Sequence, residues 1–342
     1  MENVVDLILA DANLDKRFIL DFPYRYFVDS IRLSHSTLQT YDSCPRKFEF
    51  TKLYQNPKHT DSLAASFGSA LHIGFQEYLI SGDYNRAVYK MMLAYPWEYG
   101  ESPTKDRSAE GALALLDEMI RVFPSERFQL AHITIDGEVR PCVEVPFQIH
   151  FAGFENIYQP ALDGTSPPRK IALTYVGFMD LVLYDNEEDR YIVVDIKTTA
   201  ESAQDQSPKY RYSDQCVPYG LVLNKILGVP SDDLSIAYYV ANPSIATPRA
   251  TMIYFYKSSE DLSDWQMQMV ECLNSLKRRI QLGWFPRTRS GCLAYKRVCP
   301  FYEYCQDRDS KRTQLQLAYS GEREEIKPFE PWVDVTINLT ED

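Results

Sequence analysis

Apolar positions recur at helical spacing through much of the first half of the chain. Four of them are spaced four residues apart and form one stripe: Phe67, Leu71, Phe75 and Leu79. This stripe predicts a buried helix face within a mostly helical region from about 64 to 130. A shorter helix is expected to open with Ser36 as its N-cap and to run to Cys44. Similar patterns predict helices over 213–227 and 261–282.

The middle of the chain changes to the pattern of β-strands. Strands are expected over 142–151, 171–184, 191–198, 234–241 and 250–256, with a polar turn over 185–190. Helices followed by a largely β centre with a crossover helix indicate an α/β or α+β domain. Outside this region, residues 1–32 are expected to be an appended segment, and residues 311–342 an acidic C-terminal tail.

Composition narrows the class of protein. With 342 residues, 45% of them apolar and 13% aromatic, the chain can form a substantial core, which argues against disorder. No apolar run approaches the roughly 20 residues that span a bilayer, and residues 1–20 lack the basic start of a signal peptide. We therefore expect a soluble, intracellular protein without a membrane partner, located in the cytoplasm or, if phage-encoded, in the host cytoplasm. Seven cysteines in such a chain favour a metal or cluster over disulfides.

Charge is distributed unevenly along the chain. The net charge of −12 argues against a nucleic-acid partner, which basic side chains normally attract. The segment Lys277–Arg312, however, holds ten basic residues against three acidic ones, a local excess of +7, and it also holds six aromatic residues. Basic residues interleaved with aromatic ones suit a stacked single strand of nucleic acid. An ordinary solvated basic face over an aromatic core explains the same pattern equally well.

The run Tyr191–Lys197 ends in the sequence Asp195-Ile196-Lys197. Strand alternation places Asp195 and Lys197 on the same face, and a short turn joins this strand to the one that carries Asp180. Two adjacent carboxylates repel each other unless a cation or a proton joins them, so the pair favours a hard divalent ion. Such an ion could polarise a phosphodiester while Lys197 orients a water or stabilises the phosphorane. Taken alone, a solvated ion pair at a strand end explains the Asp-x-Lys sequence as well.

Five short motifs, read in order, resemble those of the RecB-like branch of the PD-(D/E)XK nuclease superfamily. They are Gly68-Ser69-Ala70-Leu71-His72, Val143-Glu144-Val145-Pro146-Phe147, Gly177-Phe178-Met179-Asp180, Asp195-Ile196-Lys197 and Gln215-Cys216-Val217-Pro218-Tyr219. The resemblance extends over Leu33 to Cys305. It implies a restriction-endonuclease-like fold, with a central mixed β-sheet flanked by helices, as a nuclease domain over 33–310 with a helical insertion.

The resemblance also implies a role for each residue of the motifs. It implies that His72, Asp180, Asp195 and the carbonyl of Ile196 hold one or two Mg²⁺ or Mn²⁺ ions, and that Lys197 is the catalytic lysine. Gln215 and Tyr219 would contact the DNA strand or brace the site, and Glu144 would support it. Because Gln215 and Tyr219 are four residues apart they would share a helix face, but Pro218 predicts a kink or a late helix start.

Four of the cysteines form a separate pattern, with Cys44 before the nuclease core and Cys292, Cys299 and Cys305 after it. This pattern resembles the iron-sulfur staple of the AddB-type and CRISPR-associated exonucleases. Four thiolates suit a [4Fe-4S] cluster, although tetrahedral Zn²⁺ remains an alternative. The spacing departs from the family, since six residues separate Cys292 from Cys299 where two are common. The other three cysteines lie in apolar contexts and are expected to be structural.

We therefore expect a metal-dependent DNA exonuclease that acts on single strands or DNA ends. It would serve recombination, repair, replication or phage DNA processing, and its terminal segments could dock a helicase, a recombinase or another subunit. One alternative is a non-catalytic nucleic-acid-binding or scaffold subunit of a DNA-processing complex. A further alternative is a zinc-stapled enzyme of unrelated chemistry.

Overall fold

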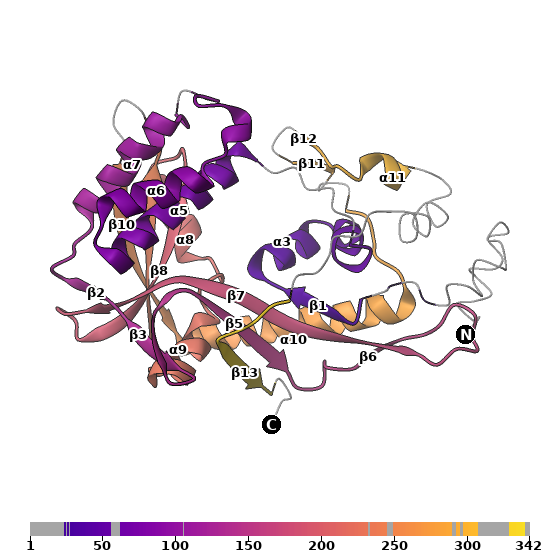
Figure 1. Ribbon diagram of the computed structural model, residues 1–342. Coiled ribbons are helices and arrows are strands. Elements are labelled where there is room, and N and C mark those ends of the chain that lie inside the picture. The colour runs from indigo at the N-terminus through magenta and orange to yellow at the C-terminus, as the bar shows by residue number, and fades with distance from the viewer. Residues whose placement is uncertain are drawn as a thin grey trace.

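A large mixed β-sheet forms the centre of the molecule (Figure 1). The computed structural model describes residues 24, 26, 28–55, 62–104, 106–231, 233–244, 249–288, 292–294, 297–306 and 328–338. The sheet has nine strands with the order β10-β9-β8-β7-β5-β13, and β1, β2 and β6 also pair with β7. Their bounds are β1 Ser30–Leu33, β2 Phe128–Leu130, β5 Val143–Phe151, β6 Ile157–Gln159, β7 Arg169–Asp185, β8 Arg190–Thr198, β9 Asp233–Asn242, β10 Arg249–Ser258 and β13 Val333–Ile337.

The pairing in this sheet is mixed in direction. Strand β7 runs antiparallel to both β5 and β8, whereas β8 and β9 run parallel and are joined through helices. Two small hairpins lie outside the sheet: β3 His132–Ile135 with β4 Glu138–Pro141, and β11 Leu293–Ala294 with β12 Arg297–Val298. The α/β class and the mixed central sheet predicted from the sequence are confirmed.

Helices cover both faces of the sheet. One layer consists of α5 Leu63–Ser81, α6 Tyr84–Ala94 and α7 Ala109–Val122, and the other contains α9 Tyr219–Leu227 and α10 Ser259–Leu282 (Figure 1). The other helices among the described residues are α3 His35–Ser43, α4 Pro45–Phe48, α8 Ala203–Arg211 and α11 Tyr302–Gln306, with a π-helical turn over Glu49–Leu53 and a 3₁₀ turn over Trp97–Tyr99.

Strand alternation divides the apolar side chains between two cores. Leu181 and Val194 pack beneath α5–α7, whereas their neighbours Val182 and Val193 pack in the core that contains α9 and α10. Residues on both faces of β7, β8 and β9 are therefore apolar, which explains the near-continuous hydrophobic runs of these strands.

The helical region expected from about 64 to 130 contains α5–α7, and its last three residues form strand β2 instead; Phe67, Leu71 and Phe75 are fully buried. The cap assigned to Ser36 is wrong. The N-cap of helix α3 lies two residues earlier, at Ser34, whose side chain accepts the backbone N–H of Thr37 at 3.3 Å.

The helix expected over 213–227 is shorter than predicted. Pro218 stands at the N-cap and α9 begins at Tyr219, so the late start is confirmed. Gln215 consequently lies in the preceding turn and shares no helix face with Tyr219. Helix α8, which was not predicted, precedes that turn and is capped by the side chain of Ser202, which accepts the N–H of Asp205 at 3.1 Å.

Both terminal segments contribute strands to the sheet, in contrast to the appended segment and tail expected from the sequence. Strand β1 pairs in parallel with β7, and β13 pairs in parallel with β5. Alternating apolar residues explain the second pairing, since Val333 and Ile337 are buried while Asp334 is exposed. Residues 1–23, 307–327 and 339–342 lie outside the described residues. In the described part of the chain, no helix combines the length and apolarity needed to cross a bilayer.

Candidate metal centre and active site

The central sheet forks where β7 and β8 separate. Their pairing ends at Leu181 and Val194; beyond it β7 continues with β5, and β8 continues with β9. At the fork a side chain replaces the backbone ladder, because Asp180 Oδ2 accepts the Ile196 N–H at 2.9 Å. A groove of about 1190 Å³ opens here, and residues from both branches line it.

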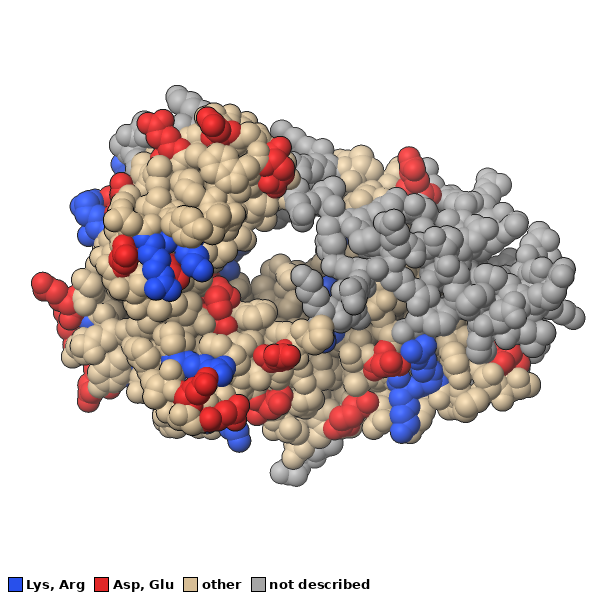
Figure 2. Space-filling view, in the orientation of Figure 1, with Lys and Arg blue, Asp and Glu red and all other residues tan. Residues whose placement is uncertain are grey.

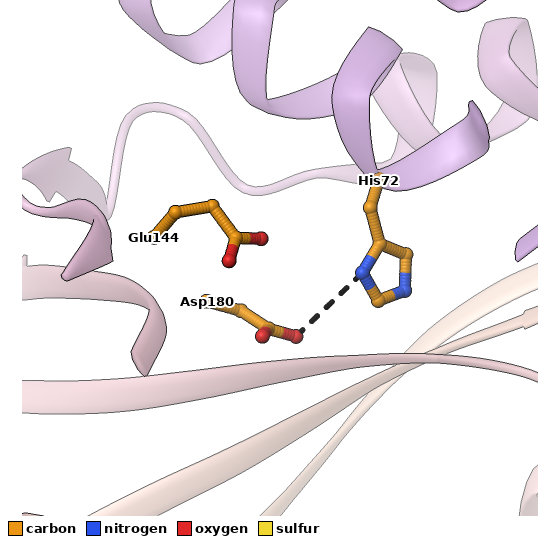
Figure 3. Close-up of side chains that lie close together, drawn as sticks. All are labelled: His72, Glu144 and Asp180. Atoms are coloured by element: carbon orange, nitrogen blue, oxygen red, sulfur yellow. Dashed lines mark ion pairs between the residues drawn. The ribbon is translucent and has the colours of Figure 1, made fainter. Parts of the chain in front are cut away.

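Three ligand-bearing side chains meet in this groove. His72 comes from α5, Glu144 from β5 and Asp180 from β7, and one ligand atom of each lies within 4.8 Å of the others (Figure 3). His72 Nδ1 lies 3.8 Å from Asp180 Oδ2, which is too long for a hydrogen bond. No other group of three or more His, Cys, Asp or Glu residues with this spacing occurs among the described residues.

The electrostatics of the trio favour a bound cation. Burial, followed by the charge of Lys197, lowers the pKa of His72 to about 4, so its ring is neutral at pH 7 and can act as a ligand. Burial raises the pKa of Asp180 well above its usual value, and the charges of Asp195 and Glu144 raise it further. A divalent ion would relieve this repulsion, as the donor set of one imidazole and two carboxylates allows.

Glu144 and Gln76 have roles in the site that the sequence did not predict. Glu144 was expected only to support the site, but its carboxylate belongs to the trio. Its backbone adopts a φ of 48°, in the left-handed region that non-glycine residues rarely occupy. Gln76 was not anticipated; its Nε2 donates to Glu144 Oε1 at 2.6 Å and lies 3.4 Å from the carbonyl of Asp180. The available signal was its position four residues after His72, on the same face of α5.

Asp195, Lys197 and Gln215 form a closed ring of contacts next to the trio. Lys197 Nζ lies 2.7 Å from Asp195 Oδ2 and donates to Gln215 Oε1 at 3.0 Å, while Gln215 Nε2 donates to Asp195 Oδ1 at 2.8 Å. Asp195 is only 1% exposed. Its Oδ2 atom contacts the Lys197 ammonium as an ion pair, but the angle of this contact does not make it a hydrogen bond. The structure thus places Asp195 beside Lys197, and Oδ2 of Asp195 can still accept a hydrogen bond or a cation.

The protonation of Lys197 follows from this ring. Burial opposes the charged form, but the adjacent Asp195 carboxylate outweighs it and the pKa of Lys197 is raised. The side chain is 32% exposed towards the groove. Lys197 is therefore a fixed positive charge next to the trio.

Tyr219 braces the groove through the backbone. Its hydroxyl donates to the carbonyl of Phe178 at 3.1 Å, and its ring packs edge-on against Phe147 at 5.6 Å. Gly177 makes room for the Phe147 ring, since a Cβ at position 177 would lie 2.5 Å from Phe147 Cζ. Of the two roles expected for Tyr219, this geometry corresponds to bracing.

The four cysteines of the expected staple gather at one end of the molecule. Cys44 links α3 and α4, and the Cys299 N–H donates to the carbonyl of Cys292 at 2.9 Å. Burial raises the pKa of Cys305 to about 11, and the nearby Cys299 and Cys44 contribute to this rise. Within the described ranges, however, no three of the sulfurs lie within 4.8 Å of one another. A closed zinc site would need separations of roughly 3.8 Å, as follows from Zn–S bonds of about 2.3 Å.

Several basic residues of Lys277–Arg312 make contacts within the protein. The Lys277 and Arg279 side chains lie over the rings of Phe154 and Tyr41, and Arg287 donates to the carbonyl of Cys305. Residues 289–291, 295–296 and 307–312 lie outside the described residues. On the face in Figure 2, the described Lys and Arg side chains are interspersed with Asp and Glu.

Comparison with known proteins identifies the family. Residues 32–306 match the model of the PD-(D/E)XK nuclease superfamily, a span of most of the chain that includes the whole trio. The chain belongs to the PD-(D/E)XK nuclease superfamily. Nucleases of this superfamily use divalent metals, and the cluster of His72, Glu144 and Asp180 is an acidic site that fits one.

Two solved structures are similar to this PD-(D/E)XK chain. One is the crystal structure of a proposed exonuclease from Eubacterium rectale, with 13% identity, a TM-score of 0.43 and coverage of 86% of this chain and 94% of that one. The other is the crystal structure of SSO0001, with 12% identity, a TM-score of 0.22 and coverage of 61% of this chain and 74% of that one. No curated protein matches the chain.

Proposed function

We propose that the chain is a metal-dependent DNA exonuclease of the RecB-like branch, which hydrolyses phosphodiester bonds on single strands or DNA ends. The observation that carries the proposal is the position of His72, Glu144 and Asp180 beside a protonated Lys197 in one groove. A cation site next to a fixed positive charge is suited to a substrate that carries negative charge at the reacting group. Recombination, repair, replication and phage DNA processing are processes that need such an activity.

The side chains of the trio would hold Mg²⁺ or Mn²⁺. The carbonyl of Ile196 and Asp195 Oδ2, which also contacts Lys197 Nζ at 2.7 Å, would complete the donor set. When bound, the ion supplies Lewis-acid polarisation of the phosphodiester and lowers the pKa of a coordinated water. Gln76 keeps Glu144 directed into the groove.

Lys197 would act as the catalytic lysine. Its ammonium group faces the groove, where it can orient a water or stabilise the charge that develops on phosphate oxygens. Asp195 and Gln215 hold its Nζ from two directions, so its position is fixed before substrate arrives. This preorganisation gives Gln215 a positioning role through Lys197 rather than a direct contact with the DNA strand.

We further propose that Cys44, Cys292, Cys299 and Cys305 hold a [4Fe-4S] cluster. The support is that the chain brings Cys44 into the same region as three cysteines about 250 positions later, where Cys305 is influenced by two of the others. Such a cluster would tie the ends of the nuclease domain together.

A time course on end-labelled single- and double-stranded DNA in Mn²⁺ or Mg²⁺ tests the nuclease proposal. Wild type should release nucleotides progressively from an end, while Asp180→Asn and Lys197→Ala should each reduce the rate by about 10² to 10³. Asp163→Asn provides a control, since this partly exposed carboxylate hydrogen-bonds to Thr165 and Ser166 in its own turn and does not line the groove. Tight binding to DNA ends without cleavage in either ion would contradict catalysis and favour a scaffold subunit. Cleavage of RNA alone would contradict the assignment of DNA as substrate.

A further inference from the structure

An exposed aromatic ring lies beside the proposed metal site. Phe178 is 48% exposed although it belongs to the central strand β7, and it lines the groove together with Asp180. Because the two residues are two positions apart on one strand, their side chains lie on the same face. Phe329 lines the same groove, so two aromatic rings form an apolar surface next to the proposed cation site.

The position of this ring is fixed by its surroundings. The backbone at Phe178 pairs with Pro146 of β5, and its carbonyl accepts the Tyr219 hydroxyl at 3.1 Å. Phe329 meets the Phe178 ring edge-to-face, with centroids 5.6 Å apart and an interplanar angle of 82°. The guanidinium of Arg32 lies 5.6 Å from the centre of the Phe329 ring and also lines the groove.

The spacing between Phe178 and Asp180 determines what the ring can contact. Two residues of a strand span about 6.6 Å, which is the scale of a single nucleotide unit. With a phosphate at the trio, a base that stacks on Phe178 therefore belongs to the nucleotide directly attached to that phosphate. Every base has a π-face, so such a contact would be tolerant of sequence.

We propose that Phe178, supported by Phe329 and Arg32, stacks on the unpaired base next to the scissile phosphate and so makes a single-stranded end the substrate. This inference rests on the proposed nuclease function and specifies which form of DNA the site accepts. A base that is stacked on protein at this position is separated from its neighbours in a duplex, so duplex ends would have to open before cleavage. Phe178 is thus a positioning residue for the substrate.

Cleavage kinetics with a modified strand test the contact. In single-turnover reactions on single-stranded DNA, Phe178→Ala should raise the concentration for half-maximal rate about five- to a hundredfold, the range expected for losing one stacked base. An abasic site at the terminal nucleotide should impose a similar loss on wild type but no additional loss on Phe178→Ala. Phe178→Tyr should restore both the rate and the sensitivity to the abasic site. Tyr158→Ala is the matched control, since this exposed ring lies on β6 and does not line the groove.

A spectroscopic measurement reports stacking without cleavage. Strands carrying 2-aminopurine at the end, bound in a metal-free buffer, should lose fluorescence on binding wild type and Phe178→Tyr but not Phe178→Ala. If wild type cleaves DNA while Phe178→Ala retains both the quenching and the abasic sensitivity, the stacking inference is wrong and the nuclease function stands. If wild type cleaves nothing in any divalent ion yet quenches through Phe178, the nuclease function is wrong and the stacking site stands.

Discussion

Gln76 shows how a neutral side chain can control the proposed metal site. Its amide binds Glu144 Oε1 at 2.6 Å and also approaches the backbone of Asp180, so it joins helix α5 to strands β5 and β7. The backbone of Glu144 has a φ of 48°, a conformation that is rare for a residue other than glycine, and the Gln76 hydrogen bond fixes the orientation of its carboxylate. Replacing residues that hold metal ligands in this way typically costs about 10- to 100-fold in metal affinity or activity.

Replacing Gln76 should therefore weaken metal binding. We expect Gln76→Ala to raise the Mn²⁺ concentration for half-maximal cleavage by about tenfold or more, because Glu144 loses the hydrogen bond that orients it. The maximal rate at saturating Mn²⁺ should change much less. A Mn²⁺ titration of the cleavage rate measures both quantities, and Gln129→Ala, an exposed substitution on β2, is the control. An unchanged titration midpoint would show that Gln76 has no part in holding the ion.

At this scale the sequence predicted some positions well. Strand alternation and one short turn were sufficient to place Asp180, Asp195 and Lys197 close together, because these features depend only on local geometry. The contact of Asp195 with Lys197 rather than with the trio depends on the fork of the sheet, which no local pattern shows. Glu144 has a positive φ within strand β5, which the sequence does not reveal either.

Among the secondary-structure elements, β2 is tied to the end of β7 by a salt bridge. Arg127 Nε and Nη2 donate to the two oxygens of Asp185 at 2.9 and 2.6 Å, and the guanidinium lies over the rings of Phe128 and Tyr254. Burial alone would raise the pKa of Asp185, but the hydrogen bonds from Arg127 outweigh it and the pKa is lowered. The pair therefore stabilises the folded state only while Asp185 is ionised.

The contribution of the Arg127–Asp185 pair to the free energy of unfolding should depend on pH. Because the folded pKa lies below the unfolded value of about 3.9, the contribution is complete above that value and is lost as the pH falls through the folded pKa. We expect Asp185→Asn to lower the free energy of unfolding by about 2 kcal/mol at pH 7. The difference from wild type should shrink below about pH 4. Urea unfolding at several pH values measures this.

A second variant distinguishes the effect of the Arg127–Asp185 pair on stability from that of an exposed ion pair. Glu187 also contacts Arg127, at 3.1 Å, but its side chain is 65% exposed. Glu187→Gln should therefore change the free energy of unfolding by less than about 0.5 kcal/mol. A difference between wild type and Asp185→Asn that stays constant down to pH 2 would contradict the assignment.

Helices and strands whose apolar residues recur at a regular spacing were predicted from the sequence, and those without such a pattern were not. Helix α10 and strands β7–β10 carry long periodic apolar patterns, and their predicted bounds lie within two residues of the observed ones. Helix α8 was missed because its sequence, AQDQSPKYR, is polar and contains Pro208. Strands β1 and β13 are short, and their pairing partners lie more than a hundred residues away in sequence. Tertiary pairing, rather than local preference, decides such elements.

For the molecule as a whole, segments from the two ends of the nuclease domain pack together. The rings of Phe50 and Phe301 stack with centroids 5.1 Å apart, Phe48 stacks on Phe285 at 6.3 Å, and the Arg46 N–H donates to the carbonyl of Pro286 at 3.1 Å. The four cysteines of the proposed cluster lie in these same segments. The cysteine pattern in the sequence predicted that the two ends would meet, but the aromatic packing that brings them together was not predicted.

The proposed cluster should be a stabilising connection between these ends. Protein purified without oxygen should be brown, with broad visible absorbance and about four iron atoms per chain. Cys299→Ser and Cys305→Ser should lose the colour and the iron, and they should unfold at a lower temperature, because the long loop from Cys44 is no longer closed. Cys272→Ala is the matched control, since this partly buried cysteine lies on α10 outside the group. A colourless protein with one zinc per chain would replace the cluster with a zinc site, and a wild type with neither metal that unfolds like Cys305→Ser would exclude both.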